Sequence, residues 1–289
     1  MNVLLRNSIR RFTLPRLLFV VVMLLFAVFM LLPIVFIVSH AFKPYDELFV
    51  YPPEFIVRRP TTQNFIELAQ ITSGSIIPIS RYLFNSILIS AATVLLTTII
   101  SAMCGYALAK QPFPGRKILF ATIVLMLMFA PEVVQIPRYL VVSGLGLMNT
   151  YPGHILPLLA LPVGVFLLKQ FMEQIPNALL EAARIDGATE FGLFLKIAVP
   201  VCMPAVATVA ILSFQNSWSN LETSSYFMQD DYMKTFPYFL STLTSNLANN
   251  VARQGAAAVA TLIVLAPNLI FFIILQRRVI DTMVHSGIK

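Results

Sequence analysis

Six runs of mostly apolar residues, separated by polar, proline-rich or charged segments, divide the chain of 289 residues. A helix needs about 20 such residues to cross the hydrocarbon core of a bilayer. The pattern therefore predicts an all-α membrane protein with six transmembrane helices. The expected runs are 17–38, 83–109, a run that starts at 118 and weakens near "APEVVQIP", 154–171, 203–220 and 255–275.

The first run allows two readings, a retained span or the apolar part of a cleaved signal peptide. Residues 17–38 form a longer apolar stretch than signal peptides usually carry. The sequence "SHAFKPYDEL" follows it in place of a small-residue cleavage site. We therefore expect a retained first span, followed by a polar, proline-rich loop at 39–80.

The composition agrees with lipid as the solvent. Hydrophobic residues make up 58% of the chain and charged residues only 11%, whereas about a quarter of the residues of a soluble domain are charged. The net charge is +7, but no basic stripe with interleaved aromatics is present. We therefore expect anionic membrane lipid, and no nucleic acid, as the partner of the excess positive charge.

Lysine and arginine positions orient the predicted helices, because short cytoplasmic segments are enriched in both. Both tails, the turn "KQPFPGRK" and the segment 169–200 together contain 13 of the 20 Lys and Arg residues. We therefore place these four segments in the cytoplasm. The predicted organisation is a cytoplasmic tail at 1–16, a first span at 17–38, an extracytoplasmic loop at 39–80, a transmembrane core at 81–276 and a cytoplasmic tail at 277–289.

Motifs for catalysis and metal binding are absent from the sequence. The chain lacks the phosphate-binding GxxxxGK[ST] motif, HExxH and GxSxG. Its histidines are far apart, and its two cysteines lie in or beside apolar runs; these residues are His40, His154, His285, Cys104 and Cys202. We therefore expect a non-enzymatic protein with no cofactor and no metal of its own.

Two other classes of membrane protein require residues that the apolar runs largely lack. An ion-coupled secondary transporter needs Asp, Glu or Arg at membrane depth, and the six runs hold almost none. Glu132 lies near the outer end of the third run, where contact with solvent explains it. An integral membrane enzyme needs clustered catalytic residues at membrane depth, and the sequence shows no such cluster.

The segment "EAARIDGATEFGLFLKIAVP" at 181–200 is polar at one end and apolar at the other. Asn177 is a candidate N-cap for a helix that runs toward Asp186. Gly187 follows at the position where a left-handed residue ends a helix, and Thr189 can cap a second helix. The segment therefore predicts a helix, a glycine turn and a second helix.

The side chains of this hairpin leave two readings open. Ala182 and Ala183 are small and allow a partner to approach closely, while charged and large apolar residues flank them. Exposed apolar residues of this kind mark a protein interface, but the hairpin can also pack beneath the helix bundle. The flanking residues are Glu181, Arg184, Asp186, Phe191, Phe194 and Leu195.

The spacing of this segment resembles the signature loop of bacterial ATP-binding-cassette importer permeases. It reads "EAA", three residues, glycine, nine residues, and isoleucine three positions before proline, here Ile197 and Pro200. The surrounding sequence "GLGLMNTYPGHILPLLALPVGVFLLKQFMEQIPNALLEAARIDGAT" resembles the carbohydrate-uptake branch, in particular the shorter permease of the maltose-type pair. The similarity covers about residues 80–289.

The resemblance implies a type I importer (MetI-like) transmembrane domain with a cytoplasmic coupling helix between spans 4 and 5. It implies import of a carbohydrate, with an oligosaccharide favoured over other solutes, across the bacterial cytoplasmic membrane. The implied partners are a second permease, two ATPase subunits that bind ATP-Mg, and an extracytoplasmic substrate-binding protein. Within the coupling loop, 173–200, the implied ATPase contacts are Glu181, Ala182, Ala183, Arg184, Asp186 and Gly187, with Ile197 and Pro200 fixing the return into the membrane.

The polar end of the fifth run, "SFQNSWSN", is the expected substrate path. An aromatic ring can stack on the apolar face of a sugar while amides bond its hydroxyls. Trp218 can equally sit at the membrane interface, and Asn85 in the second run can equally serve helix packing. Relatives often carry an acidic or amide residue directly after the tryptophan, and in this chain the acidic residue is displaced to Glu222. The candidate path residues are Gln215, Asn216, Trp218, Asn220 and Asn85.

Overall fold

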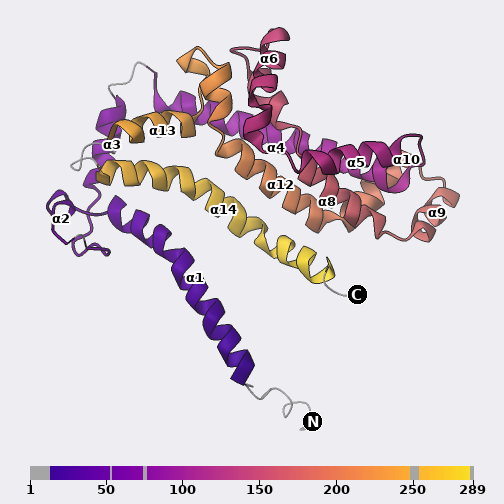
Figure 1. Cartoon of the computed structure of the whole chain (residues 1–289), viewed down its shortest axis with the longest axis horizontal. Coiled ribbons are helices and arrows are strands. Elements are labelled where there is room, and N and C mark those ends of the chain that lie inside the picture. Colours follow the sequence, from indigo (N-terminus) through magenta and orange to yellow (C-terminus); the bar gives the residue numbers. More distant parts are fainter. Residues whose placement is uncertain (1–13, 53, 74–76, 248–253, 287–289) are drawn as a thin grey trace. The chain divides into compact units, whose positions relative to one another are not determined.

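The computed structural model describes residues 14–52, 54–73, 77–247 and 254–286 (Figure 1). All regular structure within these ranges is helical, which confirms the all-α prediction. The side chains of both basic tails lie outside the described residues. The chain divides into two compact units, residues 1–70 with 246–262 and residues 71–245 with 263–289.

Among the described residues, three helices are long and apolar enough to cross a membrane: α1 (Leu14–Ala41), α4 (Ile79–Lys110) and α14 (Gln254–Ser286). Three bent helix pairs bring the number of candidate spans to six. The bends measure 109°, 48° and 82° and lie within Arg116–Gly144, Tyr151–Glu173 and Glu190–Trp218. The six predicted spans thus correspond to three continuous helices and, where each bent pair counts as one span, to three interrupted ones.

Prolines account for the interruptions. Pro131, Pro162 and Pro204 each occupy one of the first two positions of the element that follows a break. Proline lacks the N–H that a continuing helix requires and fixes a backbone angle that suits the first turn of a new one. Each proline therefore ends one helical segment and starts the next at an angle.

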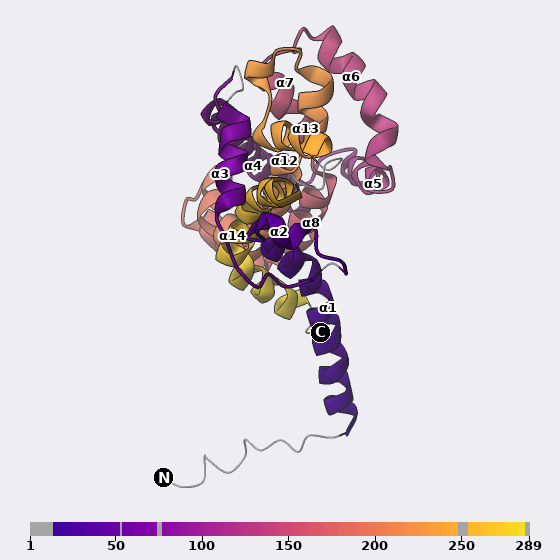
Figure 2. The ribbon, with the colours of Figure 1, turned by 90° about the vertical axis from the view of Figure 1, so that its left-hand side faces the viewer.

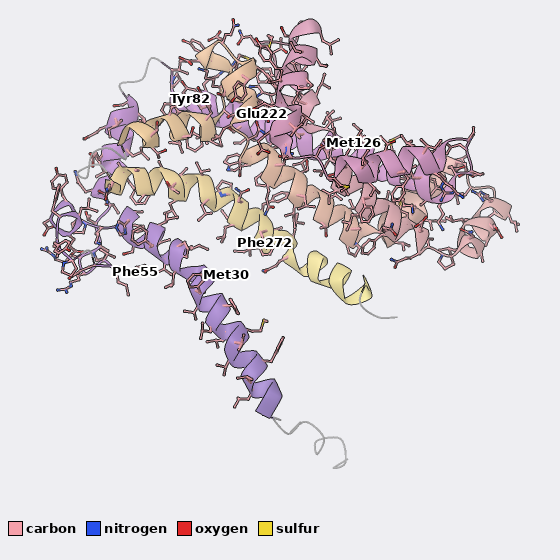
Figure 3. The ribbon with its side chains drawn as sticks, in the orientation of Figure 1. Met30, Phe55, Tyr82, Met126, Glu222 and Phe272 are labelled. Atoms are coloured by element: carbon pink, nitrogen blue, oxygen red, sulfur yellow. The ribbon has the colours of Figure 1, made fainter. Side chains whose placement is uncertain are left out.

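The first unit contains α1, the short helix α2 (Tyr45–Leu48) and most of α3 (Gln63–Ser73). Side chains on α1 project outward along most of its length, as Figure 3 shows at Met30. The loop after α1 is held by buried polar groups, because Lys43 donates to the carbonyl of Glu54 at 2.5 Å and Glu47 accepts from two backbone N–H groups. Part of the segment predicted as a polar loop is therefore ordered by its own hydrogen bonds.

The core of the second unit is α4 packed against α8 (Pro162–Glu173) and α12 (Met203–Trp218). The α4–α8 contact is close, because a Cβ added to Gly105 would lie 2.9 Å from the Cβ of Leu168. The buried face of α4 carries small polar side chains, which are typical of tight helix contacts in membranes. They are Ser86, Ser90, Thr93, Thr97 and Ser101.

Helix α5 (Arg116–Met126) covers α8, with Phe120 stacked on Phe166 at a centroid distance of 6.0 Å. Beyond the 109° bend, α6 (Gln135–Gly144) and α7 (Tyr151–Ile155) lie at one end of the unit (Figure 2). The same end holds the π-helical segment η4 (Thr223–Phe227) and α13 (Phe236–Leu247). The opposite end of α4 reaches the segment at 173–200 through Lys110.

Candidate functional site

The segment at 173–200 folds as the predicted hairpin. Helix α9 (Asn177–Ile185) ends before Gly187, whose φ of +85° is left-handed, and α10 (Glu190–Leu193) follows. A Cβ on Gly187 would meet open space, so the backbone conformation, and not a shortage of room, favours glycine here. Thr189 caps α10 by accepting a hydrogen bond from the N–H of Gly192 at 3.2 Å.

One detail of the predicted hairpin is wrong. Pro176 occupies the N-cap position of α9, and Asn177 is the first helical residue without a capping hydrogen bond. The Asn177 side chain instead accepts a hydrogen bond from Lys110 Nζ at 2.9 Å. Proline fixes the extended backbone that leads into a helix, so the amide is free to bond another element.

One face of the hairpin is buried against the helix core. Leu180, Leu193 and Phe194 are 2%, 0% and 8% exposed and join a cluster with Tyr106 of α4 and Met172 of α8. Ala183 and Ile197 are partly buried against the same cluster. The hairpin therefore packs beneath the helix bundle through this face, which is one of the two alternatives that the sequence left open.

The other face is apolar and exposed. Ile185 is 86% exposed and Phe191 63%, and Leu179 and Leu195 are also exposed. Two short helices cannot cover so much apolar surface by themselves, and exposed patches of this kind mark interaction sites. Figure 1 shows α9 and α10 at one extremity of their unit, where a partner has room. The second interpretation, an interface, therefore stays a prediction for this face.

Polar bonds attach the hairpin to the end of α4. Lys110 Nζ donates to the carbonyl of Ile175 at 2.6 Å, next to its bond to Asn177. Glu190 accepts from Gln111 Nε2 at 2.6 Å and from the hydroxyl of Tyr106 at 3.3 Å. The sequence reading missed Lys110 and Glu190. Each is an ionisable residue at the end of an apolar run or helix, where a bond to a neighbouring element is a common role.

The eight predicted docking residues all lie on this hairpin, in different environments. Arg184 donates to Glu190 at 2.9 Å, and this hydrogen bond raises the pKa of the Arg184 guanidinium. Glu181 and Asp186 are exposed and form no ion pair with any described side chain. Ala182 and Pro200 are exposed as well. Exposed acidic groups without an intrachain partner are available to a second protein.

A pocket of about 500 Å³, with a mostly apolar lining, lies at the end of α12. Arg138 of α6 and Glu222 form an ion pair with Nη1–Oε distances of 2.9 and 2.8 Å, and both side chains are mostly buried. Asn216 and Asn220 line the same pocket. The remaining wall is apolar and includes Met126, which Figure 3 marks together with Glu222. The pocket therefore combines amides and an ion pair with apolar surface.

The predicted path residues divide between this pocket and the helix packing. Gln215 and Asn216 are exposed, whereas Asn220 accepts from the N–H and hydroxyl of Thr223 at 2.9 and 3.0 Å. Trp218 is 5% exposed, stacks on Phe214 and donates to the carbonyl of Val264 at 3.0 Å. The Trp218 ring is therefore packed against Phe214, and its N–H is bonded to the backbone of α14. Trp218 does not line the pocket.

Asn85 is fully buried and has every polar group bonded. Its amide donates to the carbonyls of Tyr232 and Lys234 at 2.8 and 2.9 Å, and its oxygen accepts from Tyr151 at 2.9 Å. A buried amide with three partners is costly to disrupt. The packing role that the sequence left open for Asn85 is the one that the structure shows.

Comparisons of the sequence with known proteins identify one family model and several similar permeases. A family model described as "binding-protein-dependent transport system inner membrane component" matches residues 98–279. The permease AraQ of the arabinooligosaccharide transport system of Halalkalibacterium halodurans is 38% identical over 205 residues, which are 71% of this chain and 72% of the relative. The permease SugB of the trehalose transport system of Mycobacterium tuberculosis is 31% identical over 232 residues, which are 80% and 84% of the two chains.

A solved structure shares the fold. A chain from a bacterial ABC transporter involved in the import of the acidic polysaccharide alginate superposes with a TM-score of 0.76 and 19% sequence identity. The match covers 90% of this chain and 95% of the other. The helix order and the bent helix pairs thus belong to a known architecture.

Proposed function

The chain belongs to the family of inner membrane components of binding-protein-dependent transport systems, and we propose that it is a permease subunit of an ATP-driven carbohydrate importer. Its partners in this proposal are a second permease, two ATPase subunits and an extracytoplasmic substrate-binding protein. The ATPase subunits bind ATP-Mg and supply the hydrolysis. A solved complex of the related alginate transporter with a periplasmic protein supports the last of these partners.

The two-faced hairpin is the observation that carries the proposal. Its buried face joins Leu180 and Phe194 to the helix core, and its other face presents Ile185 and Phe191 to the outside. An element that is fixed to the bundle on one side and apolar on the other can transmit a partner's movement. We assign the exposed face, with Glu181, Ala182 and Asp186, to contact with an ATPase subunit.

The bonds between the hairpin and the end of α4 allow a movement of the hairpin to reach the membrane helices. Lys110 and Glu190 join the hairpin to the last turn of α4 and to Gln111. Helix α4 in turn packs along α8 and α12. A displacement of the docking face is therefore passed to the helices that line the core, and the permease alternates between inward-facing and outward-facing states.

The orientation follows from the charge distribution and the helix packing. Gly105 lies against Leu168, so the last turns of α4 and α8 lie on the same side of the membrane. This side carries the hairpin and the turn "KQPFPGRK", which contains Lys110, Arg116 and Lys117, and we assign it to the cytoplasm. In this proposal both termini, the tails 1–16 and 277–289, lie in the cytoplasm, the loop 39–80 is extracytoplasmic, and the core 81–276 spans the membrane.

The pocket beside Glu222 is the proposed substrate path. Asn216 and Asn220 line the pocket and supply amides that can bond sugar hydroxyls, and the apolar wall can contact the ring faces. Gln215 is exposed next to them in the chain and stays a candidate path residue. Trp218 and Asn85 hold the surrounding helices in place and act on the path indirectly. The relatives named for arabinooligosaccharides and trehalose support a carbohydrate, and we favour an oligosaccharide.

Site-directed cross-linking tests the docking face. In a background with Cys104 replaced by serine, Ala182→Cys is expected to cross-link to a co-purifying ATPase. Leu145, which is 67% exposed directly after α6, serves as the matched control, and Leu145→Cys is expected to give no such product. A cross-link at Leu145 without one at Ala182, or purification without an ATPase and a second permease, would contradict the proposal.

Reconstituted transport tests the energy source and the cargo. Proteoliposomes of the complex and its binding protein are expected to accumulate a labelled arabinooligosaccharide only when ATP is present on the hairpin side. Glu181→Lys is expected to abolish this uptake with normal membrane insertion, because Glu181 has no ion-pair partner among the described residues. Uptake driven by an ion gradient without ATP would point to a secondary transporter instead.

A further inference from the structure

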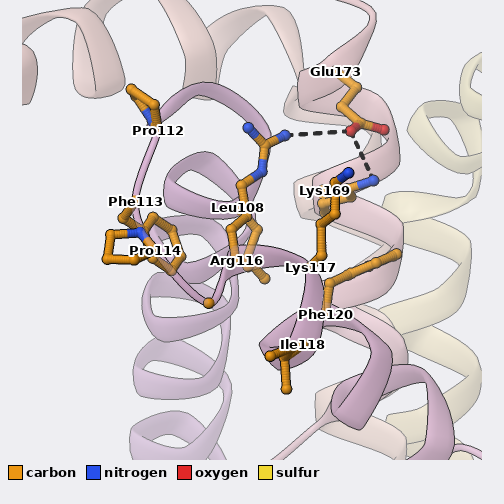
Figure 4. A pocket seen from close by; sticks show the side chains of 11 residues that line it. Leu108, Pro112, Phe113, Pro114, Arg116, Lys117, Ile118, Phe120, Lys169 and Glu173 are labelled. Carbon is orange, nitrogen blue, oxygen red and sulfur yellow. Dashed lines mark ion pairs between the residues drawn. The ribbon is translucent and has the colours of Figure 1, made fainter.

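A second pocket, of about 1010 Å³, lies where α4 ends and α5 begins. Its walls are the end of α4, the loop 111–115, the first turns of α5 and the last turns of α8 (Figure 4). Lys110 at the end of α4 also bonds the hairpin, so the pocket is on the hairpin side of the membrane. Neither docking nor the substrate path uses the residues that line it.

The pocket has an excess of positive charge. Arg116, Lys117 and Lys169 line it together with a single acid, Glu173. Glu173 is shared by Lys169 at 2.7 Å and Arg116 at 3.7 Å, as the dashed lines in Figure 4 mark. Lys117 is exposed and forms no ion pair with the described side chains. Three cations therefore face one carboxylate, and the site has an unbalanced charge of about +2 at neutral pH.

The most buried cation sits against apolar surface. The Lys169 side chain is 12% exposed, and its Nζ lies 4.1 Å from the ring centroid of Phe120. The loop contributes Pro112, Phe113 and Pro114, drawn in Figure 4 across the pocket from Lys169. Ile118 on α5 is 75% exposed and also lines the pocket. In this pocket, cationic side chains are thus bordered by apolar side chains at the ends of two membrane helices.

We propose that this pocket binds the headgroup phosphate of an anionic phospholipid. The guanidinium of Arg116 can present two N–H groups to phosphate oxygens, and Lys117 adds an ammonium without an acidic partner. The apolar border favours a lipid over free phosphate, because acyl chains can follow Ile118 and the outer face of α5. Basic pockets between transmembrane helices are known to bind lipid headgroups in this way.

Native mass spectrometry of the assembled complex tests the proposal. The complex is released from nanodiscs that contain phosphatidylglycerol or phosphatidylcholine with identical acyl chains. We expect retained phosphatidylglycerol and at least fivefold less phosphatidylcholine. Lys117→Gln is expected to reduce phosphatidylglycerol retention about fivefold, the change that corresponds to about 1 kcal/mol for one cation near a membrane surface, and adding Arg116→Gln is expected to reduce it further.

Matched controls separate this site from general charge effects. Arg58→Gln removes another exposed cation, which lies in the first unit and pairs with Glu54, and is expected to leave lipid retention unchanged. Equal retention of both lipids, or equal losses in the Lys117 and Arg58 variants, would overturn the proposal. Displacement of the lipid by millimolar inorganic phosphate would show that the pocket recognises free phosphate, which would also overturn the assignment to a lipid.

Discussion

Arg138 and Glu222 form a two-oxygen ion pair, with Nη1–Oε distances of 2.9 and 2.8 Å, that joins α6 to the segment after α12. The two residues are 84 positions apart in the chain. Both side chains are mostly buried, so water screens their attraction less than it would at an open surface. Both residues line the pocket at the end of α12 that we assign to the substrate path.

Reversing one member of this pair is expected to block transport. Arg138→Glu places two carboxylates in a mostly buried space, and uptake should fall at least tenfold. The double variant Arg138→Glu with Glu222→Arg restores an opposite-charge pair and should recover most of the activity. A double-mutant cycle on thermal unfolding should give a coupling free energy on the order of 1–3 kcal/mol. Additive effects would mean that the two residues act separately.

Gly187 offers a test of backbone conformation within the hairpin. Its φ of +85° disfavours side chains, but an added Cβ meets open space. Asparagine tolerates this region, as Asn149 does in this chain with a φ of 58°. We expect Gly187→Asn to keep most of the uptake and Gly187→Val to lose it, because the strain of about 1–3 kcal/mol shifts the docking face. Equal uptake by both variants would show that the turn geometry is unimportant.

Gly105 tests the contact between α4 and α8. An alanine Cβ would lie 2.9 Å from Leu168 and 3.0 Å from the backbone nitrogen of Lys169. We expect Gly105→Ala to destabilise the protein by about 1–3 kcal/mol, because the helices must move apart. Gly144→Ala is the control, since a Cβ there meets nothing within 4 Å. Unfolding in detergent, followed by circular dichroism, compares the two variants.

The sequence predicted the features that depend on neighbouring residues. The turn at Gly187 and the cap at Thr189 are local, because each involves residues within three positions. Apolar runs of membrane length likewise predicted the helices, and Pro131, Pro162 and Pro204 account for the bends. The motif around Glu181 could be matched to a family because its spacing is contained in one short segment.

Features that depend on distant residues could not be predicted. The bond from Lys110 to Asn177 spans 67 positions, and the bond from Gln111 to Glu190 spans 79. The sequence shows that Trp218 is near amides, but not that its N–H faces the Val264 carbonyl. Which side of a helix faces a cavity depends on the packing of all its neighbours. The structure therefore changes the proposed role of Trp218 from substrate stacking to helix packing.

This change alters the expected effect of substitutions at Trp218. Trp218→Phe keeps an aromatic ring beside Phe214 but removes the hydrogen bond to Val264. We expect a loss of about 0.5–1.5 kcal/mol in stability and equal decreases in basal and substrate-stimulated ATPase activity of the complex. Asn216→Ala, which changes the pocket wall, should lower mainly the stimulated activity. A selective loss of stimulation in Trp218→Phe would return this residue to the substrate path.

Lys110 tests whether the hairpin and α4 move together. Its amino group donates to the Ile175 carbonyl at 2.6 Å and to Asn177 at 2.9 Å, so it fixes the start of α9 to the end of α4. Lys110→Ala removes both bonds and leaves the docking face unchanged. We expect the complex to assemble and hydrolyse ATP while uptake falls at least tenfold, because movement of the hairpin no longer reaches α4. Lys110→Arg retains the charge and the donors and should recover a large part of the uptake. If Lys110→Ala lowers ATPase activity and uptake by the same factor, the residue stabilises the assembly and does not transmit movement.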